Sequence, residues 1–125
     1  MKQEVQMKNI LVVDDCRTTR KLITYLLSGG GFNILQAENG LDALEKLARN
    51  DVDMVMTDMN MPKMDGIELI KSMKEDEAYR KIPIIMLTTE ADAEEKKRGL
   101  MTGASSYLTK PVERQVLMEE LGKYV

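Results

Sequence analysis

Residues 10–15 of the chain read Ile10-Leu11-Val12-Val13-Asp14-Asp15. Four consecutive apolar residues followed by two acidic ones predict a short strand that is buried on both faces and ends at a polar position. An amphipathic helix is predicted next, over about residues 17–28, and the run Gly29-Gly30-Gly31 ends it. The predicted apolar face of this helix consists of Leu22, Ile23, Leu26 and Leu27. A buried strand followed by an amphipathic helix is the repeating unit of an α/β fold.

This unit recurs along the rest of the chain. Further strands are predicted at 34–37, 54–56, 84–87 and 106–109, and further helices at about 41–50, 65–73, 92–102 and 113–123. The predicted inward residues of the second and last helices include Leu41, Leu44, Leu47, Val116, Leu117 and Leu121. Five strands alternating with five helices predict an α/β domain with a parallel sheet. Because the strands are apolar throughout, helices are expected on both faces of the sheet.

Composition narrows the possible functions. The 125 residues predict a single domain, 1–125, with residues 1–7 as a short N-terminal extension and Met7 as an alternative start. The absence of histidine excludes Ser-His-Asp catalysis and histidine-ligated zinc on this chain, and the single cysteine, Cys16, fits a reducing cytoplasm. A net charge of −3 does not favour nucleic-acid binding, and no apolar run approaches the roughly 20 residues of a membrane span.

Five polar residues follow the predicted strands: Asp14, Asp15, Asp58, Thr88 and Lys110. Because ligands of open α/β sheets bind outside the carboxyl ends of the strands, we expect these side chains to converge in one crevice. Three close carboxylates repel one another and favour a bound cation, and an open all-oxygen site suits Mg²⁺. Carboxylate, cation, hydroxyl and ammonium together favour phosphoryl transfer, with the carboxylate as nucleophile.

These residues, in this order, resemble the receiver domain of bacterial response regulators. The segment Thr57–Gly66 resembles the phosphoacceptor loop of that family, and Lys110–Pro111 its Lys-Pro pair, which has a cis peptide bond. Asn60 together with Glu90, and the segment Gly103–Tyr107, resemble the single-domain chemotaxis regulators of the family. The resemblance implies a doubly wound, flavodoxin-like (βα)5 fold with a five-stranded parallel sheet in the order 2-1-3-4-5.

The resemblance also implies roles for the residues at the strand ends. Asp58 would accept a phosphoryl group from the phosphohistidine of another protein, and Lys110 would contact that group. Asp15 and Asp58 would bind Mg²⁺ through their side chains and Asn60 through its backbone carbonyl, with Asp14 acting partly through water. Mn²⁺ would be a possible substitute for Mg²⁺.

Two further sets of residues would control the phosphorylated state. Thr88 and Tyr107 would form a switch, in which the hydroxyl of Thr88 moves to the phosphoryl group and the ring of Tyr107 turns into the vacated space. Asn60, Thr89 and Glu90 would tune the rate of dephosphorylation. Thr89 departs from the alanine typical of chemotaxis regulators, so its bulk could narrow access to the acceptor.

The predicted function is that of a stand-alone receiver in a two-component system, with a chemotaxis system as the favoured one. Such a receiver acts through contacts with other proteins and is not an enzyme. The implied partners are a sensor histidine kinase or histidine phosphotransfer protein, a target such as a flagellar motor switch component, and a phosphatase. The alternatives are a phosphorelay intermediate or a phosphate sink. An aspartyl-phosphate phosphatase of the haloacid dehalogenase type fits less well, because such enzymes need an aspartate where this chain has Asn60.

Overall fold

Strands and helices alternate along the whole of the chain that the computed structural model describes, residues 7–89 and 91–125. Their bounds are β1 (Lys8–Val13), α1 (Arg17–Leu27), β2 (Phe32–Ala37), α2 (Gly40–Arg49), β3 (Met54–Asp58), α3 (Gly66–Lys74), β4 (Ile84–Thr89), α4 (Ala93–Thr102), β5 (Ser106–Lys110) and α5 (Arg114–Leu121). The strands form one parallel sheet in the order β2-β1-β3-β4-β5, which confirms the predicted fold class and strand order. Glu90 and residues 1–6 of the predicted N-terminal extension lie outside the described residues.

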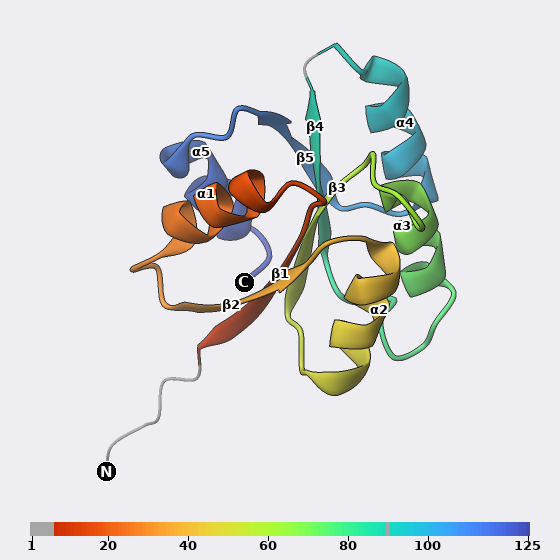
Figure 1. The fold of residues 1–125 in the computed structure, drawn as a ribbon, viewed down its shortest axis with the longest axis horizontal. Helices are drawn as coiled ribbons and strands as arrows, with labels where there is room; N and C mark the ends of the chain where they lie inside the picture. Colours follow the sequence, from red (N-terminus) through yellow and green to blue (C-terminus); the bar gives the residue numbers. More distant parts are fainter. Residues whose placement is uncertain (1–6, 90) are drawn as a thin grey trace.

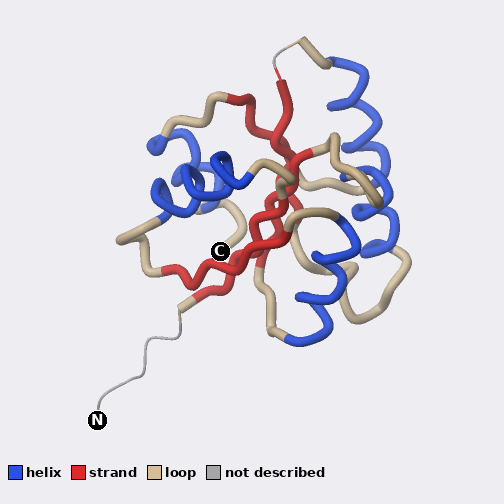
Figure 2. The backbone as a smooth tube through the Cα atoms, viewed as in Figure 1, coloured by secondary structure: helices blue, strands red, loops and turns tan. Residues whose placement is uncertain are grey.

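The sheet is the middle of three layers. Helices α1 and α5 cover one face, and α2, α3 and α4 cover the other (Figure 1). In the tube view, the strands run through the centre of the molecule between the two groups of helices (Figure 2). Alternate residues of β1 enter two separate apolar clusters: Ile10 and Val12 pack beneath α1 and α5, while Leu11 and Val13 pack beneath α2 and α3. The uninterrupted apolar run of β1 is therefore explained by burial on both faces.

Three residues predicted to face inward are exposed instead. Leu22 of α1, Leu41 of α2 and Val116 of α5 have exposed fractions of 47%, 51% and 48%. In α1 the buried stripe is formed by Ile23 and Leu27, which are one helical turn apart. Leu22 precedes this stripe by one residue, or about 100° of helix rotation, and so lies at its edge.

The loop between β3 and α3 closes tightly over the end of β3. Asp65 caps α3 by accepting a hydrogen bond from the backbone N–H of Glu68, and the side chain of Glu68 completes the capping box by accepting from the backbone N–H of Asp65. A Cβ atom at Gly66 would lie 2.7 Å from the carbonyl oxygen of Asp58 and 2.8 Å from Cα of Met59. Glycine at position 66 therefore lets the start of α3 approach the residue that ends β3.

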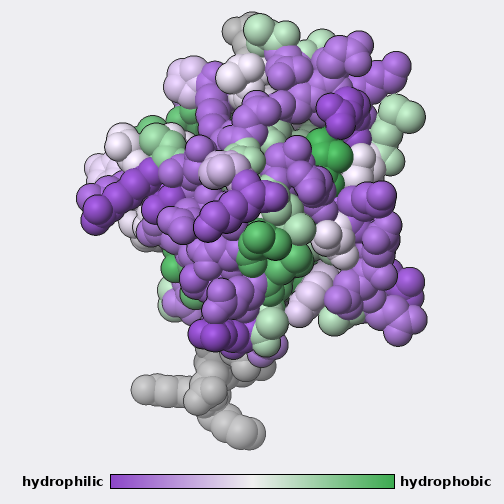
Figure 3. All heavy atoms as spheres, turned by 45° about the vertical axis from the view of Figure 1, so that its right-hand side comes forward, coloured by the Kyte–Doolittle hydropathy of each residue, from purple (hydrophilic) through white to green (hydrophobic). Residues whose placement is uncertain are grey.

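The surface is polar over most of the face that Figure 3 presents, with apolar side chains in small separate groups. Among the described residues, no helix is both long enough and apolar enough to cross a membrane.

Helix α4 lies close to the sheet because it carries glycine at the contact. A Cβ atom at Gly99 would overlap the sulfur of Met86 and lie 2.7 Å from its terminal methyl carbon. We therefore predict that Gly99→Ala displaces α4 and lowers the free energy of unfolding by roughly 1–3 kcal/mol, measured by urea denaturation. Gly122→Ala is the matched control, since its nearest neighbours would be 3.5 Å away and its φ of −60° suits alanine. Equal stability of the two variants would contradict a tight contact at Gly99.

Candidate functional site

Three carboxylates meet at the carboxyl edge of the sheet. Asp14 follows β1, Asp15 is the next residue, and Asp58 ends β3. One oxygen atom from each of the three lies within 4.8 Å of the others. The register explains this proximity, since Val13, the last residue of β1, is paired with Thr57, the residue before Asp58. Asp14 is buried, Asp58 is partly buried and Asp15 is exposed, so the cluster opens to solvent on the side of Asp15.

Lys110 joins the cluster from β5. Its Nζ lies 3.0 Å from Oδ1 of Asp58 and 3.1 Å from Oδ2 of Asp14, close enough for an ion pair with each. The side chain of Asp14 is 1% exposed, that of Asp58 14% and that of Lys110 27%. The cluster thus holds three carboxylates and one ammonium group, which leaves the site with an excess of negative charge. The Lys110–Pro111 peptide bond that follows is cis.

The crowding of charge perturbs the pKa of two of these groups. Burial is the largest cause at Asp58 and raises its pKa; the charge of Asp14 also raises it, and the hydrogen bond from Lys110 only partly offsets the two. Burial lowers the pKa of Lys110, but its hydrogen bonds to Asp58 and Asp14 outweigh this effect and leave the pKa raised. Lys110 is therefore held as a cation, while ionised Asp58 remains costly without a further positive charge.

The loop after β1 is fixed by its own hydrogen bonds. The backbone N–H of Asp14 donates to the carbonyl of Ala37, and Oδ1 of Asp14 accepts from the N–H of Cys16 at 2.9 Å. Cys16 occupies the N-cap position of α1. Arg20 of α1 donates to the carbonyl oxygen of Asp14 at 2.6 Å. Asp14 consequently helps to start α1 and also contributes a carboxylate to the cluster.

The two residues predicted to form a switch occupy different environments. Thr88 is 1% exposed, and its hydroxyl oxygen has no hydrogen-bond partner within residues 7–89 and 91–125. It lies on β4 directly after Leu87, the register partner of Asp58. Tyr107 of β5 is 41% exposed, and the ammonium group of Lys96 lies 4.9 Å from the centre of its ring, within range of a cation–π interaction. The ring of Tyr107 is thus turned outward.

Asn60 and Thr89 lie around this edge of the sheet, and both are exposed. Thr89 is the last residue of β4 and is paired with Lys110. Asn60 donates from Nδ2 to Oε2 of Glu95 in α4 at 3.1 Å, a contact that the sequence did not indicate. At Glu95, burial is the largest cause of a raised pKa; the charges of Asp92 and Asp58 add to it, and the bond from Asn60 opposes it. The predicted position Glu90 lies outside the described residues.

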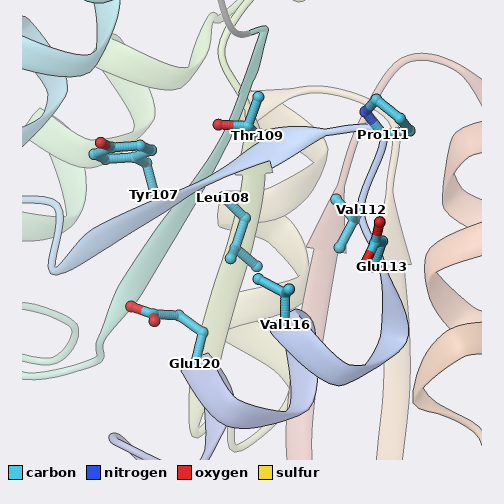
Figure 4. A pocket seen from close by; sticks show the side chains of 8 residues that line it. All are labelled: Tyr107, Leu108, Thr109, Pro111, Val112, Glu113, Val116 and Glu120. Atoms are coloured by element: carbon cyan, nitrogen blue, oxygen red, sulfur yellow. The ribbon is translucent and has the colours of Figure 1, made fainter.

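A separate groove of about 480 Å³ lies between β5 and α5, and none of the three carboxylates of the cluster lines it. In Figure 4, Leu108 of β5 and Val116 of α5 point toward one another across the groove. Tyr107 lies at one end and Pro111 at the other (Figure 4). The exposed fraction of Val116 is explained by its place on this groove.

The doubly wound sheet, with three carboxylates and a lysine at its carboxyl edge, is the arrangement expected of a phosphoacceptor domain in two-component signalling. Residues 10–122 match the family model of the response regulator receiver domain, and the chain belongs to this family. It is 44% identical over 114 residues to the chemotaxis protein CheY1 of Helicobacter pylori. The aligned region covers 90% of this chain and 92% of that protein. Receivers of this CheY-like kind are signalling proteins, not classical enzymes.

Two solved structures extend the comparison. The chemotaxis protein CheY4 of Vibrio cholerae superposes with a TM-score of 0.88 at 34% identity, covering 95% of this chain and 99% of that one. The receiver domain of the sensor histidine kinase PA1611 from Pseudomonas aeruginosa has a TM-score of 0.87 at 27% identity and covers 94% of this chain and 97% of that one. That structure has a magnesium ion coordinated in its active site cleft.

The charge crowding at Asp58 predicts an effect on stability. The pKa of Asp58 is raised above its ordinary value of 3.8 in the folded protein, so protonation of Asp58 stabilises the fold. This stabilisation is complete below pH 3.8 and is lost as the pH rises through the pKa of the folded state. Without divalent cations, Asp58→Asn should therefore raise the free energy of unfolding at pH 7, measured by urea denaturation. It should also flatten the dependence on pH. Asp51→Asn, at an exposed position before β3, is the control. An Asp58→Asn variant no more stable than wild type would contradict the conclusion that ionised Asp58 is costly in the folded protein.

Proposed function

We propose that this protein is a chemotaxis-type response regulator that accepts a phosphoryl group on Asp58. One observation carries the proposal: the carboxylate of Asp58 is partly open to solvent and lies beside the ammonium group of Lys110 and two further carboxylates. A nucleophile beside a fixed cation, with a second cation site next to it, suits phosphoryl transfer, where positioning and charge neutralisation do most of the catalysis.

The donor set fits magnesium. All three side chains offer oxygen atoms, the ligands that Mg²⁺ prefers, and the exposed side of Asp15 leaves room for water ligands. Asp14, Asp15 and Asp58 would hold the ion together with the backbone carbonyl of Asn60. A bound Mg²⁺ would supply the positive charge that the three carboxylates lack and would neutralise phosphoryl oxygens.

The chain's own residues account for the transfer step. An oxygen of Asp58 attacks phosphorus while the bond from phosphorus to the donor's imidazole nitrogen breaks, and that nitrogen takes up a proton from solvent. Lys110, already 3.0 Å from Asp58, pairs with a phosphoryl oxygen as charge accumulates there. Subsequent attack by water returns Asp58 to the carboxylate and releases inorganic phosphate.

The output would depend on Thr88 and Tyr107. The hydroxyl of Thr88, which has no hydrogen-bond partner in the described part of the chain, would donate to a phosphoryl oxygen. The exposed ring of Tyr107 would then turn inward beside the groove between β5 and α5. The donor protein would be a sensor histidine kinase or a histidine phosphotransfer protein. The target would be a component of the flagellar motor switch, and the site of action the cytoplasm.

Phosphorylation at Asp58 is the first test. Incubation with acetyl phosphate and Mg²⁺ should add one phosphoryl group to the intact protein, detected by mass spectrometry, and EDTA should prevent the addition. Asp58→Asn should lose it completely, while Asp51→Asn should behave as wild type. Phosphorylation of Asp58→Asn to the wild-type extent would overturn the assignment, and repeated turnover of a phosphomonoester would favour a phosphatase instead.

The switch can be followed by fluorescence, because the chain contains no tryptophan. In a Tyr107→Trp variant, Mg²⁺ with beryllofluoride, a mimic of the phosphoryl group, should shift the emission to shorter wavelength as the ring becomes buried. Adding Thr88→Ala should abolish this shift without preventing phosphorylation from acetyl phosphate. A full shift in the double variant would remove Thr88 from the switch.

Partner binding separates the remaining alternatives. With beryllofluoride present, a chemotaxis regulator should bind a purified flagellar switch protein at least tenfold more tightly than without it, as measured by calorimetry. Binding to a histidine phosphotransfer protein alone would instead indicate a phosphorelay intermediate or a phosphate sink.

A further inference from the structure

The loop that follows Asp58 is joined to helix α4 by a side-chain hydrogen bond. Asn60 lies two residues after Asp58 and donates from Nδ2 to Oε2 of Glu95 at 3.1 Å, joining positions that are 35 residues apart. In Figure 1 the loop after β3 and the first turns of α4 are neighbours at the same edge of the molecule. The contact thus connects the phosphoacceptor loop to a separate element.

The position of Glu95 is fixed by the capping of α4. Asp92 is the N-cap residue, and its carboxylate accepts the backbone N–H of Glu95 at 3.0 Å. This bond holds Glu95 in the first turn of the helix, with its side chain partly buried against the loop. The carboxylate is also near enough for the charge of Asp58 to act on it. An anionic acceptor is therefore held beside the phosphoacceptor, within reach of the amide of Asn60.

The amide of Asn60 is a donor for which two acceptors compete once Asp58 is phosphorylated. Hydrogen bonds from an amide to a carboxylate or a phosphoryl oxygen are both charge-assisted and so of comparable strength. The amide carries two hydrogens, but a single orientation of the side chain places both, so an amide held by Glu95 cannot turn over the phosphoryl group. An amide released from Glu95 can turn over the phosphoryl group, pair with one of its oxygens and obstruct an approaching water molecule.

We propose that Glu95 is a positioning residue that withholds the side chain of Asn60 from the phosphoryl group and thereby keeps the phosphorylated state short-lived. This inference rests on the proposed phosphorylation of Asp58 and assigns to α4 a part in setting its lifetime. The action is indirect, since Glu95 acts through Asn60 and does not itself contact the reacting atoms. Removal of Asn60 should consequently remove the influence of Glu95.

The test is the first-order rate of phosphoryl loss from Asp58. Protein is phosphorylated with radiolabelled acetyl phosphate and Mg²⁺, the donor is removed, and the label that stays on the protein is followed in time. Glu95→Ala should slow the loss by roughly three- to tenfold, the range that one net hydrogen bond confers. Glu95→Gln retains a weaker neutral acceptor and should lie between wild type and Glu95→Ala. Glu94→Ala, at the exposed neighbouring position, should match wild type.

A double-mutant cycle distinguishes positioning from an effect of charge alone. In an Asn60→Ala background, Glu95→Ala should cause no further change, because the side chain that Glu95 holds is absent. A threefold or larger change in that background, or an unchanged or faster rate in Glu95→Ala alone, would overturn the inference. Circular dichroism and urea unfolding of each variant exclude a loss of fold. Failure of wild type to become labelled would instead refute the proposed function itself.

Discussion

The ion pairs of Lys110 with Asp14 and Asp58 are the interaction on which the rest of the site depends. The partners are 96 and 52 residues from Lys110 in the chain, so only the folded sheet brings them within 3.1 Å. They meet because β1, β3 and β5 are parallel and end at one edge. A buried or half-buried carboxylate needs a partner of opposite charge, and Lys110 supplies it to two of the three. The third, Asp15, remains exposed to solvent.

Helix α4 is well placed to respond to a change at this site. Its first turn carries Glu95, bonded to Asn60 of the phosphoacceptor loop, and Lys96, which lies over the ring of Tyr107. One turn later, Gly99 packs against Met86 of β4. A change of charge at Asp58 would therefore reach α4 through its polar first turn, while the glycine contact holds the helix against the sheet. Two adjacent residues of one helix thus contact both the loop after β3 and the residue predicted to switch.

The sequence predicted the sheet and its polar edge well because both depend on chemical types in order along the chain. The central strands β1, β3 and β4 are mainly apolar runs, and each of Asp14, Asp58 and Lys110 stands at a strand end, where parallel pairing determines its neighbours. The exposure of Leu22 was not predicted, because one residue of helical phase decides it. The bond from Asn60 to Glu95 also escaped prediction, because it depends on how the loop after β3 and α4 lie relative to one another.

The buried hydroxyl of Thr88 bears directly on the proposed switch. A buried hydroxyl without a hydrogen-bond partner costs free energy, and this one has none within the described part of the chain. Had stability alone shaped the position, an apolar residue of similar size would serve better at the end of β4. On the proposed function, a phosphoryl group on Asp58 provides the missing acceptor, so the unsatisfied hydroxyl raises the free energy of the unphosphorylated state relative to the phosphorylated one. The cost borne at Thr88 before phosphorylation then becomes part of the driving force for the change that follows it.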